Sequence, residues 1–230
     1  MSDEDYEIHK FTLANPDMSK EEMAQEMLKA SSWADNLTMS ILGNYFNQSL
    51  PKLPNIITHL TLGTYYNQPL PDLPLSLTHL TLDYYFNQPL PDLPPFLTHL
   101  TLSDNFNQPL PNLPPSLTHL TLGCKFNQPL PNLPPSLTHL TLGGEFGGKF
   151  NQSIDCLSQG LLYLDTGYGY NQPLINLPNI LQTLIIGINY NETLDMLPDS
   201  IEVLNIEYYK KKINKLPHNL KEITINNSYK

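Results

Sequence analysis

The sequence repeats itself every twenty residues, and this repeat constrains the fold more than any other feature. The block Leu97-Thr98-His99-Leu100-Thr101-Leu102 recurs nearly unchanged at 77–82, 117–122 and 137–142, and slightly altered at 57–62. Weaker copies begin at residues 37, 161, 181, 201 and 220, which gives ten candidate strands; four extra residues fall within 143–149 and one is lost around 208–210. A short fixed period is typical of a solenoid whose stacked coils share one core.

Each column of the repeat predicts a part of one coil, if Leu97 is taken as column 1. Columns 1, 4 and 6 are apolar and alternate with polar residues, which predicts a short strand. Prolines occupy columns 13, 15 and 18. Because proline cannot donate to a sheet ladder, these columns must form an extended return path, and twenty residues leave no room for a return helix. We therefore predict a mainly β, right-handed solenoid with a parallel sheet on one face and Pro-rich return segments.

Columns 10 and 11 predict two further rows that run from coil to coil. Column 10 is aromatic, so its rings should stack into a spine. Column 11 is asparagine, whose side chain can serve a binding site or satisfy backbone groups of the turn. We favour the structural role, because a residue used in every coil fits a ladder better than a site. The predicted ladder consists of Asn47, Asn67, Asn87, Asn107, Asn127, Asn151, Asn171 and Asn191.

The two ends of the repeat region have their own signals. Ser19-Lys20-Glu21-Glu22 is a capping box that predicts a helix to about Ala30, with Met23, Met27 and Leu28 on one face and Trp33 just beyond. The helix could dock a partner, but we favour a cap over the first coil, since an uncapped end exposes core. At the other end Lys210, Lys211 and Lys212 replace Phe-Asn-Gln, and their charges should blunt the last edge. The expected organisation is an N-terminal segment (1–36), one solenoid (37–225) and a tail (226–230).

The motifs resemble those of a known repeat family. The Leu-x-x-Leu-x-Leu run is similar to the leucine-rich-repeat core, and Phe86-Asn87-Gln88-Pro89, Phe106-Asn107-Gln108-Pro109 and Phe126-Asn127-Gln128-Pro129 resemble the signature of the FNIP repeat. The resemblance covers roughly residues 37–225. It implies an interaction module of the kind found in social amoebae and their giant viruses. Some members carry an F-box before the repeats, and we find no F-box pattern in residues 1–36.

Composition and charge narrow the function. The net charge of -10 and the pI of about 5.0 argue against a nucleic-acid binder. Residues 1–10 lack the pattern of a signal peptide and no apolar run reaches the length of a membrane span, so we expect an intracellular, cytoplasmic protein, in the host cell if the protein is viral. Cys124 and Cys156 form neither a metal spacing nor a disulfide framework. We expect no metal, no cofactor and, since the ladders give rows rather than converging groups, no enzyme.

Columns 3 and 5 should point away from the core, onto the open face of the sheet. Column 3 is a histidine row and column 5 a threonine row. A protein or peptide could lie on this face, neighbouring imidazoles could share a soft metal ion, or the row could be a by-product of repeat duplication. The histidines are His59, His79, His99, His119 and His139.

Columns 7 to 9 follow the strand and differ in almost every coil, so they should line one rim of the sheet. Tyr45, Tyr65, Tyr84 and Tyr85 gather there. Tyrosine is enriched at interfaces, which favours a binding rim over a drifting loop. The Gly-rich insertion at 143–149 opens on the same rim and could form a flexible flap.

These observations favour a non-enzymatic scaffold that binds a protein partner through the strand face and the Tyr-rich rim. The alternatives are a structural or self-assembling protein that uses the flat face or an open end, and the repeat half of a substrate-receptor system without its own F-box. We expect no nucleic-acid or membrane partner, and a monomer or weak oligomer.

Overall fold

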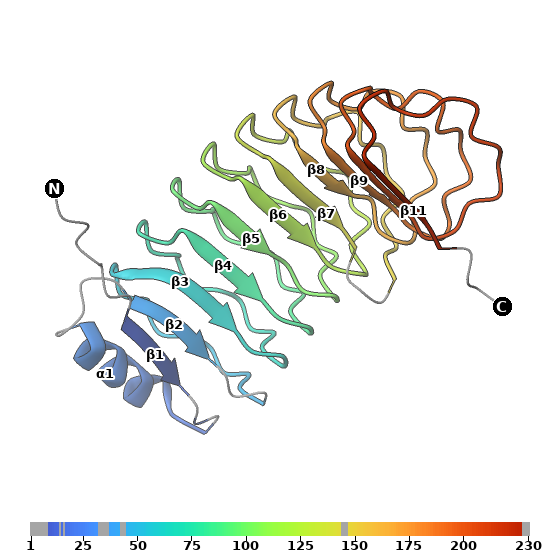
Figure 1. Cartoon of the computed structure of the whole chain (residues 1–230). Coiled ribbons are helices and arrows are strands. Elements are labelled where there is room, and N and C mark those ends of the chain that lie inside the picture. The colour runs from blue at the N-terminus through green and yellow to red at the C-terminus, as the bar shows by residue number, and fades with distance from the viewer. Residues whose placement is uncertain are drawn as a thin grey trace, which may run out of the picture.

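The structure is a solenoid built on one parallel sheet. It is a computed structural model of the chain that describes residues 9–13, 15, 17–31, 37–41, 45–143 and 147–226. Eleven strands lie side by side in chain order, from β1 at the end that carries the helix to β11 at the other (Figure 1). Every strand pair is parallel, and the return segments leave the sheet on one side. The predicted β solenoid with a short helical end is confirmed.

The strands are short and match the predicted positions. After β1 (His9–Leu13) and the helix α1 (Lys20–Ser31), the strands are β2 (Leu37–Ile41), β3 (Ile57–Leu62), β4 (His79–Leu82), β5 (His99–Thr101), β6 (His119–Leu122), β7 (His139–Leu142), β8 (Tyr163–Asp165), β9 (Thr183–Ile186), β10 (Val203–Ile206) and β11 (Glu222–Ile225). Between β3 and β7 the register pairs each residue with the one twenty positions later, for example His99 with His119.

Columns 1, 4 and 6 form the core. In the central coils these leucines are at most 2% exposed, as Leu97, Leu100 and Leu102 show. Columns 3 and 5 are half-buried on the other side of each strand, so the period of two that predicts the strand also separates core from open face.

The aromatic spine runs through the whole solenoid. Consecutive rings stack with centroids 6.0 to 6.4 Å apart, from Phe46–Tyr66 to Tyr190–Tyr209. Most of these rings are fully buried. Burial raises the pKa of the Tyr66, Tyr170 and Tyr190 hydroxyls, because the phenolate would lose its hydration.

The asparagine ladder is confirmed. The amide N–H of each ladder residue donates to the Oδ1 atom of the asparagine one coil earlier, at 2.7 to 3.0 Å from Asn67 to Asn191. The following glutamine adds a weaker contact, for example Gln108 Nε2 to Asn87 Oδ1 at 3.4 Å. The side chains are exposed or half-buried rather than buried, so the ladder ties the turns together along the surface of the coil.

The N-terminal end contains one strand that the repeat period did not reveal. β1 pairs with β2 in the register His9 to Leu37, a separation of 28 residues, because α1 replaces the proline return in this coil. The capping box is present: Glu22 N donates to Ser19 Oγ at 3.2 Å, and Ser19 N donates to Glu22 Oε2 at 2.9 Å. Met23 and Met27 join the core as predicted. Trp33 lies outside the described residues.

Two details of the ends differ from the sequence prediction. Leu28 is 65% exposed, and Ala30 takes its place in the buried face, because residues 23, 27 and 30 share a helical stripe that residue 28 leaves. At the other end, Tyr209 stacks on Tyr190 and occupies the aromatic column 10. Lys210, Lys211 and Lys212 therefore occupy columns 11 to 13, whereas the sequence prediction placed them in the Phe-Asn-Gln columns 10 to 12. Burial of the Tyr209 ring against the core therefore determines its column, although the spacing from Tyr190 is one residue short of twenty.

The Asn ladder predicts a measurable cost for losing one acceptor. Asn107→Ala should lower the free energy of unfolding by about 1 kcal/mol, because the amide of Asn127 and the side chain of Gln128 both lose Asn107 Oδ1. Asn112→Ala, an exposed asparagine of the return segment, is the matched control and should change it by less than about 0.5 kcal/mol. Denaturant unfolding measures both, and equal effects would contradict the ladder's role.

Candidate functional site

The five histidines form one continuous stack on the open face of the sheet. Neighbouring ring centroids lie 4.0 to 4.2 Å apart, with planes within 12° of each other. Tyr163 continues the row beyond His139 at 5.6 Å. Because lone pairs of parallel rings point the same way, adjacent imidazoles do not converge on a shared ion. Within the described residues no three His, Cys, Asp or Glu side chains gather as metal ligands.

The threonine before each histidine lies beside the ring. Thr98 Oγ1 donates to the carbonyl oxygen of Thr78 at 3.0 Å and also lies 2.9 Å from His99 Nδ1. The same pair of contacts recurs at residues 78, 118 and 138. Each of these Nδ1 atoms therefore has a hydroxyl partner, which holds the rings in one orientation along the face.

The stack also disfavours charge on its rings. Loss of hydration lowers the pKa of His59, His99 and His119, and the charge of other histidines in the row lowers it further. For His79 the same two causes lower the pKa to about 4. Neutral rings can stack at 4 Å, whereas imidazolium rings would repel each other.

This stack predicts that acid destabilises the protein. A folded-state pKa below the unfolded value means that the stabilisation is complete above about pH 6.5 and is lost as the pH falls through the folded-state pKa. The thermal midpoint should therefore begin to drop below about pH 6.5 and continue to drop towards about pH 4, and the part of the drop above about pH 5 lies above the usual range of carboxylate titration. His99→Gln should flatten this drop, while His218→Gln, outside the stack, should leave it unchanged. Equal pH profiles for the two variants would contradict the assignment.

The tyrosine rim is a second row at the carboxyl end of the strands. Tyr45 stacks on Tyr65 at 5.3 Å, Tyr65 stacks on Tyr85 at 4.9 Å, and Tyr84 meets Tyr85 edge to face at 4.7 Å. The four rings remain 42 to 77% exposed. The structure thus brings all four predicted tyrosines together into one exposed aromatic surface. Residues 42–44 and 144–146, which include the centre of the predicted flap, lie outside the described residues.

A groove that sequence reasoning missed runs between the threonine row and the rim. One hollow of about 440 Å³ is lined by Thr81, Thr101, Asp83, Tyr84 and Asp104, among others. A second, of about 370 Å³, is lined by Thr141, Asp165, Tyr168, Ile185 and Glu207, among others. Both hollows have Thr121 in their lining, so they are neighbours along the sheet; we call them together the rim groove, and of the four rim tyrosines Tyr84 lines it.

The rim groove is acidic. Its lining includes four carboxylates, Asp83, Asp104, Asp165 and Glu207, and no lysine. Asp165 occupies the threonine column, since it pairs with Thr141 in the sheet register. Loss of hydration and the charge of Glu207 raise the pKa of Asp165, although the amide of Gly167 donates to it at 2.9 Å. The sequence signal for this acidic site is Asp165, which replaces threonine in column 5. The other carboxylates are spread over 125 positions of the sequence, and they form a cluster only when the coils stack.

Column 7, which we had grouped with the variable rim, is partly structural. A Cβ atom on Gly123 would lie 2.1 Å from the carbonyl oxygen of Ser103, and one on Gly187 would lie 2.2 Å from that of Gly167. Glycine therefore lets successive coils approach at the groove floor.

Substitution of this glycine should be costly. Gly123→Ala should lower the free energy of unfolding by more than about 2 kcal/mol, because backbone of the preceding coil must move. Lys125→Ala in the same loop is the control, and its effect should stay below about 0.5 kcal/mol. Chemical denaturation of both variants measures the difference; a neutral Gly123→Ala would refute the close approach.

With this geometry in place, comparison with protein families identifies the repeat. The model of the FNIP repeat matches residues 46–85, 66–91 and 86–125. These coils are FNIP repeats. The signature phenylalanine or tyrosine of each FNIP coil is the ring of the aromatic spine, and the signature asparagine is the ladder residue. Leucine-rich-type repeat folds are typical of protein-interaction scaffolds.

The solved structure of CroV588 places the fold of this chain among leucine-rich-repeat folds. CroV588, a circular LRR protein of the giant virus CroV, shares 35% sequence identity at a TM-score of 0.52; the match covers 84% of this chain and 36% of CroV588. YopM from Yersinia enterocolitica WA-314 shares 21% identity at a TM-score of 0.45, over 84% of this chain and 58% of YopM. The chain thus spans about a third of CroV588. No curated protein sequence matches the chain. Among the described residues, no helix is both long and apolar enough to cross a bilayer.

Proposed function

We propose that this FNIP solenoid is a non-enzymatic scaffold that binds a protein partner along the rim groove, with the tyrosine rim on one side and the His/Thr face on the other. The observation that carries the proposal is that the exposed tyrosines meet the rim groove at Tyr84, which packs against Tyr85 and lines the first of two neighbouring hollows over several coils. Tyrosines supply large contact area at a low entropic cost, and a long groove suits an extended segment.

The charge of the groove indicates the chemistry of the partner. Four carboxylates line the rim groove without a basic residue among them, so lysine or arginine side chains of the partner would be attracted there. Asp165 is half-buried and near Glu207, and a cation between the two would relieve the repulsion that raises the pKa of Asp165. We infer a partner segment that combines basic and apolar residues.

The histidine row offers ring nitrogens on the same face. Because the Nδ1 atoms are engaged by the preceding threonines, a partner would hydrogen-bond to the row through Nε2. In this proposal residues 37–225 act as one binding unit, residues 1–36 cover its first coil, and the protein works inside the cell, where cysteine thiols such as those of Cys124 and Cys156 stay reduced.

A rim variant tests the proposal. Tyr45→Ala, Tyr65→Ala and Tyr85→Ala together should reduce recovery of the partner from native extract at least tenfold, because three exposed rings leave the interface. The matched control is Leu75→Ala with Phe96→Ala, which removes two comparably exposed apolar side chains from the return segments. Recovery is measured by affinity purification with quantitative mass spectrometry.

A charge variant tests the groove separately. Asp83→Asn with Asp104→Asn should weaken recovery of the same partner and make it less sensitive to salt, since the attraction of the groove for cations is reduced. Partner recovery that is unchanged in both the rim and the charge variant, but lost in the Leu75/Phe96 control, would place the interface on the return side and overturn the proposal.

A further inference from the structure

Among the described residues, the two ends of the sheet are edges of the same polarity. In this part of the chain β1 pairs with β2, β11 pairs with β10, neither has a second partner strand, and all strands are parallel. The amides of Glu222 and Asn226 donate to Glu202 and Ile206 of the β10 side. Successive backbone amides along a strand point to opposite sides of it. The amides of Ile223 and Ile225 in β11 therefore face away from β10. A second chain with the same strand direction could continue the sheet there.

The core columns are also exposed at the C-terminal edge. Ile223 and Ile225 stand in register with Leu204 and Ile206, which are 0% and 1% exposed. In the described part of the chain the two isoleucines are 40% and 41% exposed, and Leu216 of the same coil is 46% exposed. An apolar edge of this kind is a template for pairing with another strand.

The two ends carry opposite charge. Residues 208–221 contain five lysines and no carboxylate, whereas the described residues 15 and 17–31 contain four carboxylates, Asp17, Glu21, Glu22 and Glu26, and two lysines, of which Lys29 pairs with Glu26. Glu21 is exposed on α1 and, with Glu26, lines a hollow of about 450 Å³ on the helix. Both complementary surfaces therefore belong to one chain.

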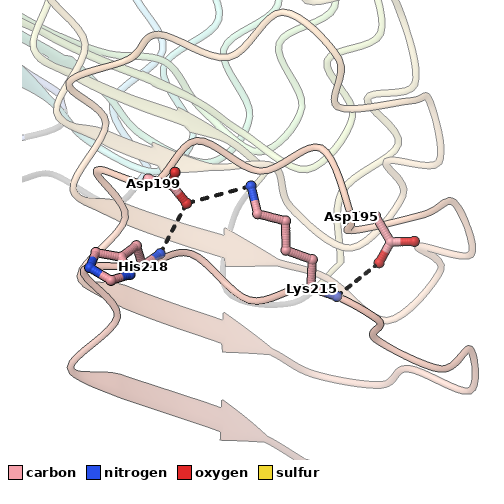
Figure 2. Close-up of polar contacts among 4 residues, drawn as sticks. All are labelled: Asp195, Asp199, Lys215 and His218. Atoms are coloured by element: carbon pink, nitrogen blue, oxygen red, sulfur yellow. Dashed lines mark hydrogen bonds and ion pairs between the residues drawn. The ribbon is translucent and has the colours of Figure 1, made fainter.

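The basic coil is held firmly against the coil before it. Figure 2 shows Asp199 accepting the backbone amide of His218 at 3.0 Å and pairing with the Lys215 ammonium at 3.6 Å, while Asp195 accepts the backbone amide of Lys215 at 3.3 Å. Lys221 pairs with Glu202 at 2.8 Å. Lys210, Lys211 and Lys212 are exposed and project from this anchored coil. These contacts fix the basic surface without neutralising its three-lysine run.

We propose that the C-terminal edge of one copy docks head to tail on the N-terminal edge of a second copy, with β11 continuing the sheet into β1 and Lys210–Lys212 facing the acidic α1 end. The contact buries Ile223 and Ile225 as interior coils bury the same columns. It is heterologous, so repetition gives a closed ring or an open filament. The inference goes beyond the proposed function, because it uses the ends of the solenoid and needs no other protein.

Sedimentation velocity of the purified full chain tests the contact. The mean sedimentation coefficient should rise with concentration at about 50 mM salt and return to the monomer value at about 500 mM, since the Debye length shortens severalfold. Lys210→Glu, Lys211→Glu and Lys212→Glu together should raise the Kd at least tenfold. The control Lys52→Glu, Lys125→Glu and Lys149→Glu makes the same charge change away from the end and should leave the Kd unchanged.

A charge swap makes the test specific for the two named ends. Glu21→Lys with Glu26→Lys should also weaken self-association, and mixing this variant with the Lys210–Lys212 variant should restore it, because acidic and basic ends meet again. Circular dichroism confirms that each variant is folded. A chain that stays monomeric at all concentrations and salts overturns the proposal, as does association that survives both variants or is not restored on mixing. None of these outcomes bears on the partner-recovery experiments above.

Discussion

Burial of an apolar wedge between coils in register is the interaction on which the rest of the structure depends. One coil of twenty residues has only three core strand positions, and neither face of its wedge is covered until another coil stacks on it. Once the coils stack, every column becomes a row. The aromatic column becomes a spine with centroids 6.0 to 6.4 Å apart, and the asparagine column becomes a hydrogen-bonded ladder. The histidine stack and the tyrosine rim both follow from the same register of the coils.

The repeat predicted nearly all of this fold, because period and alternation are properties of the chain that stacking leaves intact. It failed where the chain leaves the period. The period did not predict β1, because α1 lengthens the coil that follows it. The period also put Tyr209 outside the aromatic column, which its buried ring occupies although the spacing is one residue short. Leu28 was assigned to the wrong side of the helix, since one residue turns the helix by about 100°.

The candidate site was only partly predictable for a different physical reason. Three of the rim tyrosines, Tyr45, Tyr65 and Tyr85, lie in column 9 and Tyr84 lies beside them in column 8, so the repeat alone predicts that they come together. The rim groove combines column 5 with columns 7 and 8, and its carboxylates come from coils far apart in the sequence. The lowered pKa values of His59, His79, His99 and His119 depend on loss of hydration and on the charge of other histidines in the row, and only the stacked coils bring these together. The fold therefore depends on the columns that are the same in every coil, whereas the rim groove depends on columns that differ between coils.

Site-specific photo-crosslinking in the native cell tests this division most directly. A photoreactive amino acid would be placed at Thr101 on the groove, at Tyr65 on the rim, and at Leu75 and Phe96 on the return segments. Mass spectrometry would then identify what each position captures. The account predicts one common partner crosslinked from Thr101 and Tyr65 and absent from Leu75 and Phe96. A partner captured only from the two return positions would contradict it.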